Sequence, residues 1–122
     1  MVDARRRFGD TGEEHAAQFL LSLGHQILAR QWRSPFGEID LVSLDPNGGK
    51  PEVVFVEVKT RRSLESGFPE DSVTPAKLRH LAANAECFLE ERQWEERQHR
   101  FDVIAIIETE TGEREILHLK GV

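Results

Sequence analysis

The sequence predicts an α/β fold, in which two helices cover the two faces of a mixed five-stranded sheet as three layers, α/β/α. Strand-like segments with period-two alternation or continuous apolar runs occur as a group of three and a group of two, with a helical segment between the groups. A second helical segment precedes them all. The order αβββαββ favours a hairpin meander followed by a strand–helix–strand crossover.

Length and composition favour one globular domain over residues 1–122. The chain is 39% hydrophobic and 31% charged, which is typical of a soluble protein. No apolar run approaches the ~20 residues that a membrane span needs, and no secretory signal is apparent at the start, so we expect no membrane partner. The single cysteine, Cys87, excludes an internal disulfide and fits a reducing cytoplasm.

The first helix is predicted to open at Asp10-Thr11-Gly12, because Thr11 and Glu14 have the spacing of a capping box. Gly24 is a suitable residue to end it. Glu14 has two interpretations: it reaches back to cap the helix, or it faces the carboxylates described below. Taken from the residues alone, the cap is favoured.

Three strands are expected next, at residues 25–32, 37–44 and 53–60. The segment between the last two, from Asp45 to Pro51, is rich in Gly, Asn and Pro and predicts a turn. If this hairpin closes with Leu44 opposite Val53, then Asp40 lies opposite Glu57.

These strands carry charged side chains where buried strands usually carry apolar ones. Side chains alternate along a strand, so Glu57 and Lys59 share one face, and Glu38 and Asp40 share a face of the preceding strand. Carboxylates that converge need a counter-charge. Here it could be Lys59, a divalent cation, or both.

The rest of the chain supplies a loop, a helix and two strands. Residues 61–72 lack periodicity and predict a loop that is a candidate flap, and a helix follows from Thr74-Pro75 to about Arg92. Residues 100–108 predict a strand buried on both faces, and residues 114–120 predict a final, edge strand. We interpret Asp102 as a strand-end or N-terminal contact.

The charge is unevenly distributed along the chain. The formal net charge of −6 comes from residues 63–122, with seven basic and thirteen acidic residues, whereas residues 1–62 carry nine of each. Basic side chains therefore accompany the carboxylates, so the total charge neither supports nor excludes a polyanionic substrate. The five scattered histidines have no zinc-ligand spacing.

Four motifs together resemble the YraN family (UPF0102), and through it the PD-(D/E)XK nucleases, in particular archaeal Holliday-junction resolvases. They are Gly12-Glu13-Glu14, GEIDLV at residues 37–42, FVEVKTR at residues 55–61, and RFDV at residues 100–103. The resemblance implies a restriction-endonuclease-like order of elements. It also implies an Mg²⁺- or Mn²⁺-dependent DNA endonuclease, and a homodimer by analogy.

The resemblance also assigns roles to residues. Asp40 matches the metal-binding aspartate, Glu57 the acidic residue of the (D/E)XK element, and Lys59 its lysine. Glu14 matches a helix-one glutamate that binds metal, which reverses the preference for a cap. The resemblance places a helper residue at Lys77, and we expect Arg61, Arg62 and the N-terminal arginines to contact phosphates. The competing interpretation is a structural Asp/Glu/Lys cluster in a catalytically silent module that binds nucleic acid or protein.

Overall fold

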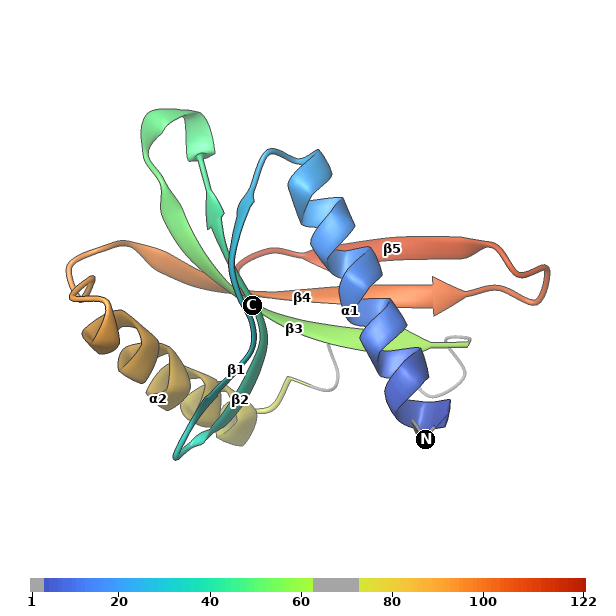
Figure 1. Cartoon of the computed structure of the whole chain (residues 1–122), viewed down its shortest axis with the longest axis horizontal. Coiled ribbons are helices and arrows are strands. Elements are labelled where there is room, and N and C mark those ends of the chain that lie inside the picture. The colour runs from blue at the N-terminus through green and yellow to red at the C-terminus, as the bar shows by residue number, and fades with distance from the viewer. Residues whose placement is uncertain (1–3, 63–72) are drawn as a thin grey trace.

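The elements follow the predicted order in a computed structural model, which describes residues 4–62 and 73–122 (Figure 1). They are α1 (Ala4–Ser22), β1 (Gln26–Ser34), β2 (Gly37–Asp45), a 3-10 turn at Asn47–Gly49, β3 (Glu52–Arg61), α2 (Pro75–Glu91), β4 (His99–Glu108) and β5 (Arg114–Leu119). Most of the expected flap, residues 63–72, lies outside the described residues. Within the described residues, no helix is long and apolar enough to cross a membrane.

The five strands form one mixed sheet in the order β1-β2-β3-β4-β5, so β3 is central and β5 lies at an edge, as expected. The neighbours β3 and β4 are parallel, and the other pairs are antiparallel. Leu44 pairs with Val53 and Leu41 with Val56, which confirms the predicted register of the hairpin. The central strand is therefore held on both sides along its first half.

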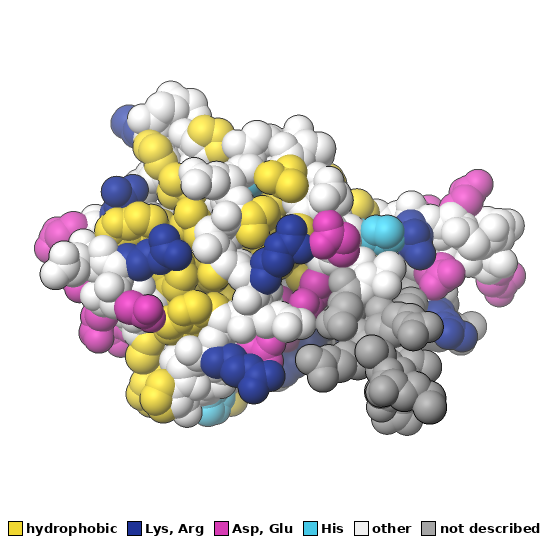
Figure 2. All heavy atoms as spheres, in the orientation of Figure 1, with side chains coloured by type: hydrophobic (Ala, Val, Ile, Leu, Met, Phe, Trp, Pro, Cys, Tyr) yellow, Lys and Arg dark blue, Asp and Glu magenta, His cyan; other side chains and the backbone are white. Residues whose placement is uncertain are grey.

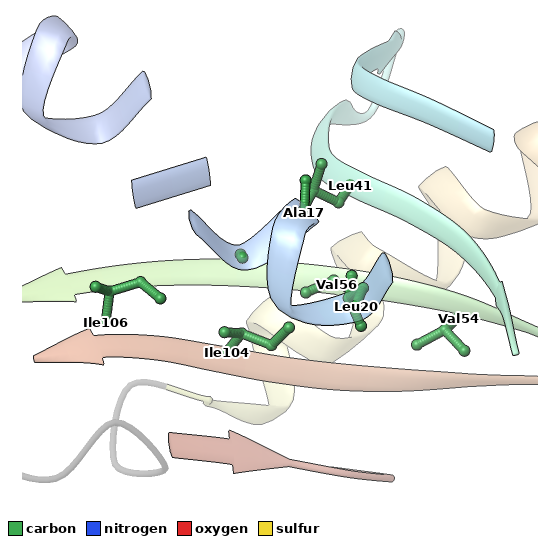
Figure 3. Close-up of a cluster of buried hydrophobic side chains, with 8 residues drawn as sticks. Ala17, Leu20, Leu41, Val54, Val56, Ile104 and Ile106 are labelled. Carbon is green, nitrogen blue, oxygen red and sulfur yellow. The ribbon is translucent and has the colours of Figure 1, made fainter. Parts of the chain in front are cut away.

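The two helices cover opposite faces of the sheet (Figure 1). On one face, α1 buries small and branched residues against the strands, most of them labelled in Figure 3: Ala16, Ala17, Leu20, Leu41, Val54, Val56, Ile104 and Ile106. On the other face, α2 packs a more aromatic cluster: Ile39, Val42, Val53, Phe55, Ala85, Phe88 and Leu89. The predicted three-layer α/β/α arrangement is confirmed, and β4 is buried on both faces through residues 102–107.

The start of α1 differs from the prediction. The helix begins at Ala4 rather than near Asp10, so Thr11 and Glu14 lie in its interior, and the capping box is wrong. Gly12 misleads the sequence argument because glycine disfavours a helix interior. It is buried where α1 crosses β3, and a Cβ added there would overlap the Thr60 Cγ2 methyl. The lack of a side chain at Gly12 thus allows the helix to approach the strand closely.

The other helix ends agree with the sequence. Gly24 has a φ of +89°, and the N–H groups of His25 and Gly24 donate to the carbonyls of Leu20 and Leu21, which is a Schellman end. Thr74 caps α2: its Oγ1 accepts a 3.2 Å hydrogen bond from the N–H of Lys77. Both ends therefore form from local chemistry that can be read in the sequence.

Candidate active site

The candidate site lies where β2 and β3 part. Their ladder ends at the pair Leu41–Val56, one position before Asp40 and Glu57. Beyond it, the main-chain N–H of Val58 donates to Asp40 Oδ2 at 2.8 Å, so a side chain takes the place of a neighbouring strand. The parallel β3–β4 ladder meanwhile continues to Arg61. This point of separation, which we call the fork, leaves one edge of β3 without a neighbour among the described strands, while the other edge stays paired with β4.

Asp40 is a partly buried carboxylate whose surroundings disfavour its charge. Desolvation by burial raises its pKa above the ordinary value, and the nearby charges of Glu57 and Glu38 raise it further. The hydrogen bond from Val58 and the charge of Lys59 act in the opposite direction but do not compensate. The groups of the described residues therefore do not fully compensate the negative charge of Asp40.

Glu57 lies beside Asp40, and one of its two carboxylate oxygens lies within ion-pair distance of a lysine. Its Oε1 lies 2.9 Å from Lys59 Nζ and 4.0 Å from Lys77 Nζ, while its Oε2 is buried and has no hydrogen-bond partner among the residues that the structure describes. The side chains of Glu57 and Lys59 are 19% and 20% exposed, so this ion pair is largely shielded from solvent. A buried carboxylate oxygen without a donor is unfavourable unless another cation or donor reaches it.

A cleft opens beside Glu57, between α2 and the turn that joins β1 to β2. Its volume is about 220 Å³. On the face of the molecule that Figure 2 draws, acidic and basic side chains lie close together. The cleft is lined by Phe36, Gly37, Glu38, Glu57, Lys77, His80, Leu81 and Asn84.

The donor set fits a hard divalent cation in part. Asp40 and Glu57 provide carboxylate oxygens, the ligands that Mg²⁺ and Mn²⁺ prefer, and no described residue donates a hydrogen bond to Glu57 Oε2. In the described ranges, however, no three His, Cys, Asp or Glu side chains converge closely enough to hold a metal ion. Asp40 and Glu57 are therefore the candidate ligands at the fork, with Glu38 nearby at the edge of the cleft.

Glu14, the expected third carboxylate, is engaged elsewhere. Its Oε2 accepts a 2.6 Å bond from Arg30 on β1, and its Oε1 accepts a 3.0 Å bond from Gln18. Hydrogen bonds from Gln18 and Arg30 lower the pKa of this exposed carboxyl. Neither the cap nor the metal-facing interpretation describes these contacts.

The residues expected to contact phosphate are dispersed. Lys77 lines the cleft. Arg61 lies two residues beyond Lys59 on the same face of β3, and its buried Nε has no hydrogen-bond partner in the described part of the chain. Arg62 is exposed and lines a separate hollow with Glu108 and Glu110. The side chains of Arg5, Arg6 and Arg7 lie outside the described residues.

A second charged cluster, at the far end of the sheet, is larger than the sequence indicates. Asp102 is a strand-end contact, as expected, but its buried carboxylate accepts from Arg100, from His118 at 2.7 Å and from the N–H of Gly121. Arg100 also bridges Asp45 and Glu52 at 2.9 Å. The sequence contains one indication that Asp102 is buried. Alternate residues of a strand share a face, so Asp102 lies on the same face as the buried Ile104 and Ile106.

Comparison with known proteins identifies the family. The model of the family described as "Uncharacterised protein family UPF0102" matches residues 12–106. A UPF0102 protein of Beutenbergia cavernae is 40% identical over 119 residues, covering 98% of each chain. One of Pelobacter propionicus is 42% identical over 114 residues, 93% of this chain and 80% of the relative. One of Caldicellulosiruptor saccharolyticus is 41% identical over 102 residues, 84% and 83% of the two chains. The chain belongs to the UPF0102 family.

Proposed function

We propose that the protein hydrolyses phosphodiester bonds in DNA as an Mg²⁺- or Mn²⁺-dependent endonuclease. One observation carries the proposal: at the fork, the partly buried Asp40 lies beside Glu57, whose Oε2 has no hydrogen-bond partner in residues 4–62 and 73–122. Two desolvated carboxylates beside a lysine form an arrangement that binding of a cation would stabilise. The resemblance of GEIDLV and FVEVKTR to the PD-(D/E)XK nucleases points to the same chemistry.

Each residue has a role in this proposal. Asp40 and Glu57 would hold the cation, whose contribution would be to polarise a phosphoryl oxygen and to make water easier to deprotonate. Val58 fixes the orientation of the Asp40 carboxylate through its N–H. Lys59 orients the attacking water or stabilises the charge that develops on the phosphate. Lys77 and Arg61 provide positive charge for the flanking phosphates.

Glu14 is not one of the two primary ligands in this proposal, because Arg30 and Gln18 hold its carboxylate. It could reach the cation only after exchanging these partners. Arg62 would contact DNA farther from the cleft, since it lines a different hollow. The homodimer and the cytoplasmic setting remain predictions.

A catalytically silent module is the second candidate, and one observation favours it. Lys59 Nζ already lies 2.9 Å from Glu57 Oε1, so part of the cluster's charge is neutralised without a metal ion. Buried ion pairs of this kind can be purely structural. In that case the cluster would persist, and the surface would bind nucleic acid or a protein without turnover.

Calorimetric titration of Mg²⁺ and Mn²⁺ tests the metal site. We expect binding to wild type, loss of binding in Asp40→Ala and Glu57→Gln, and retention in Glu14→Gln. Glu91→Gln serves as the matched control, because Glu91 is an exposed glutamate at the end of α2. Binding that survives Asp40→Ala would overturn the assignment of the site.

Cleavage assays on duplex, single-stranded and branched DNA then separate the two candidates. The endonuclease proposal requires cleavage that depends on the added cation and disappears in Asp40→Ala. If the cation binds but no DNA is cut, the silent module is correct.

A further inference from the structure

The turn between β1 and β2 places an aromatic ring at the rim of the cleft. Phe36 is 54% exposed and lines the cleft together with Glu57 and Lys77. Among the described residues, it is the one aromatic side chain among the exposed large hydrophobic residues. A single exposed apolar residue is ordinary, so the exposure alone carries no conclusion. Its support does.

A buried polar side chain holds this turn. Asn84, on α2, is 2% exposed, and its Oδ1 accepts a hydrogen bond from Ser34 Oγ. Ser34 Oγ in turn accepts a 3.0 Å bond from the N–H of Phe36. Figure 1 shows the turn lying against the first half of α2. The position of the aromatic residue is thus fixed by a hydrogen-bonded relay from inside the protein.

Gly37 completes the support. Its φ is +138°, and a Cβ there would lie 3.1 Å from Asn84 Nδ2, so a side chain would be strained and crowded. The backbone next to Phe36 is therefore shaped to let Asn84 approach. A ring whose backbone is already ordered loses little further conformational entropy when it binds a ligand.

The chemistry of the cleft matches one nucleotide. Phe36 offers an apolar ring, and Lys77 Nζ, 4.0 Å from Glu57, offers a cation for a phosphate. A base presents a flat face that stacks on aromatic side chains, irrespective of sequence. Inside a duplex both faces are already stacked, so the ring can reach a base only where that base is unstacked.

We propose that Phe36 stacks on an unpaired base, and that the enzyme thereby selects DNA in which the phosphate at Glu57 adjoins an unstacked nucleotide. The inference rests on the proposed nuclease function for the identity of the ligand. It adds a specificity-determining residue that lies outside the carboxylate cluster and reads the state of the base rather than its sequence.

The test compares two oligonucleotides by fluorescence anisotropy in the presence of Mg²⁺: a fully paired duplex, and the same duplex with one unpaired base. Phosphorothioate linkages slow cleavage during the measurement. We expect Phe36→Ala to weaken binding to the unpaired substrate by about 5- to 150-fold, the range for loss of one base–aromatic stack, and to leave the duplex Kd unchanged.

Matched variants separate stacking from simple apolar contact. Phe36→Trp should restore the preference, whereas Phe36→Leu should not, because leucine keeps the apolar volume without the ring. Leu23→Ala is the control for an exposed apolar side chain, at 50% exposure and outside the residues that line the cleft. A loss that is equal on both substrates, or no loss in Phe36→Ala, would overturn the inference.

The two proposals fail separately. A protein that cuts no DNA but shows the Phe36-dependent preference in binding would refute the nuclease and keep the stacking role. A protein that cuts DNA with the same preference in wild type and Phe36→Ala would refute the stacking role and keep the nuclease.

Discussion

The N–H of Val58 on β3 donates a 2.8 Å hydrogen bond to Asp40 on β2, across the point where the two strands separate. One main-chain donor orients this carboxylate but does not neutralise it, and burial raises its pKa. The fold therefore holds a negative charge in place while leaving its neutralisation incomplete. Such an arrangement is unfavourable for the stability of the protein without a ligand, and it is suited to binding a cation.

Asp40→Asn should stabilise the metal-free protein at neutral pH. Because desolvation raises the pKa of Asp40 above its ordinary value near 3.8, the folded state binds this proton more tightly than the unfolded state. The free energy of unfolding therefore falls as pH rises through the interval from 3.8 to the raised pKa, and the charged form remains unfavourable above it. Asparagine keeps an oxygen for the Val58 N–H.

We expect the melting temperature of Asp40→Asn to exceed that of wild type by about 3 °C at pH 7, with the difference shrinking toward pH 4. Differential scanning calorimetry without divalent cations measures both. The exposed Glu86→Gln on α2 is the control and should change little. A variant that is less stable than wild type at pH 7 would contradict the argument.

If the protein binds DNA as proposed, Lys77→Gln should weaken that binding through charge alone. Its side chain is 46% exposed and lies 4.0 Å from Glu57, so we expect its loss to change the free energy of unfolding by less than about 0.5 kcal/mol. If Lys77 contacts one phosphate, the slope of log K against log salt should become shallower by about 1. Arg79→Gln removes an exposed cation outside the cleft lining and should leave the slope as it is.

Asp102→Asn should lower stability and remove part of the sensitivity to acid. Burial raises the pKa of Asp102, but hydrogen bonds from His118, Arg100 and the Gly121 N–H outweigh it and lower the pKa below 3.8. The stability that Asp102 provides is thus fully present above pH 3.8, and it is lost as pH falls through the depressed pKa.

Urea titrations at pH 7 and below pH 4 test this. At pH 7 the variant should lose about 3 kcal/mol, because Arg100 and His118 lose their shared partner. Wild type should lose more stability than the variant on acidification. Glu115→Gln, on the exposed side of β5, is the control, and parallel acid profiles for wild type and Asp102→Asn would count against the network.

Gly12→Ala should destabilise the protein, against the usual gain for this change in a helix. The new methyl would overlap Thr60 Cγ2, and overpacking of a well-packed contact costs about 1–3 kcal/mol. Thr60→Ser removes that methyl, so the double variant should recover most of the loss. Chemical denaturation of the four proteins in this cycle gives the coupling energy, and additive effects would show that the two residues do not clash.

The sheet could be predicted from the sequence because its information is local. Alternation along 37–44 and 53–60, together with the turn at Asp45–Pro51, was sufficient for a register that brings Asp40 next to Glu57. The charged pair Glu57 and Lys59 follows from the same period-two rule.

Contacts between segments that are distant in the chain cannot be predicted from local sequence patterns. The helical Gly12 makes sense only beside Thr60, and the partner of Glu14 is Arg30 on another element. The resemblance assigns Glu14 to the metal site, whereas the residues alone favour a helix cap. Neither the family motif nor the local pattern indicates which long side chain an exposed carboxylate on a helix will contact. Arg100 and Asp45, 55 residues apart, could not be paired from sequence for the same reason.

The charged cluster around Arg100 has a consequence for kinetics. It joins β2 and β3, through Asp45 and Glu52, to β4 and β5, through Asp102 and His118, which lie about fifty or more residues later in the chain. Because these contacts need four strands in place, we expect them to form late in folding, after the transition state. In that case their strength would set how slowly the native protein unfolds and would have little effect on how fast it folds. The charged cluster at the end of the sheet opposite the fork would thus lengthen the lifetime of the native state by slowing unfolding.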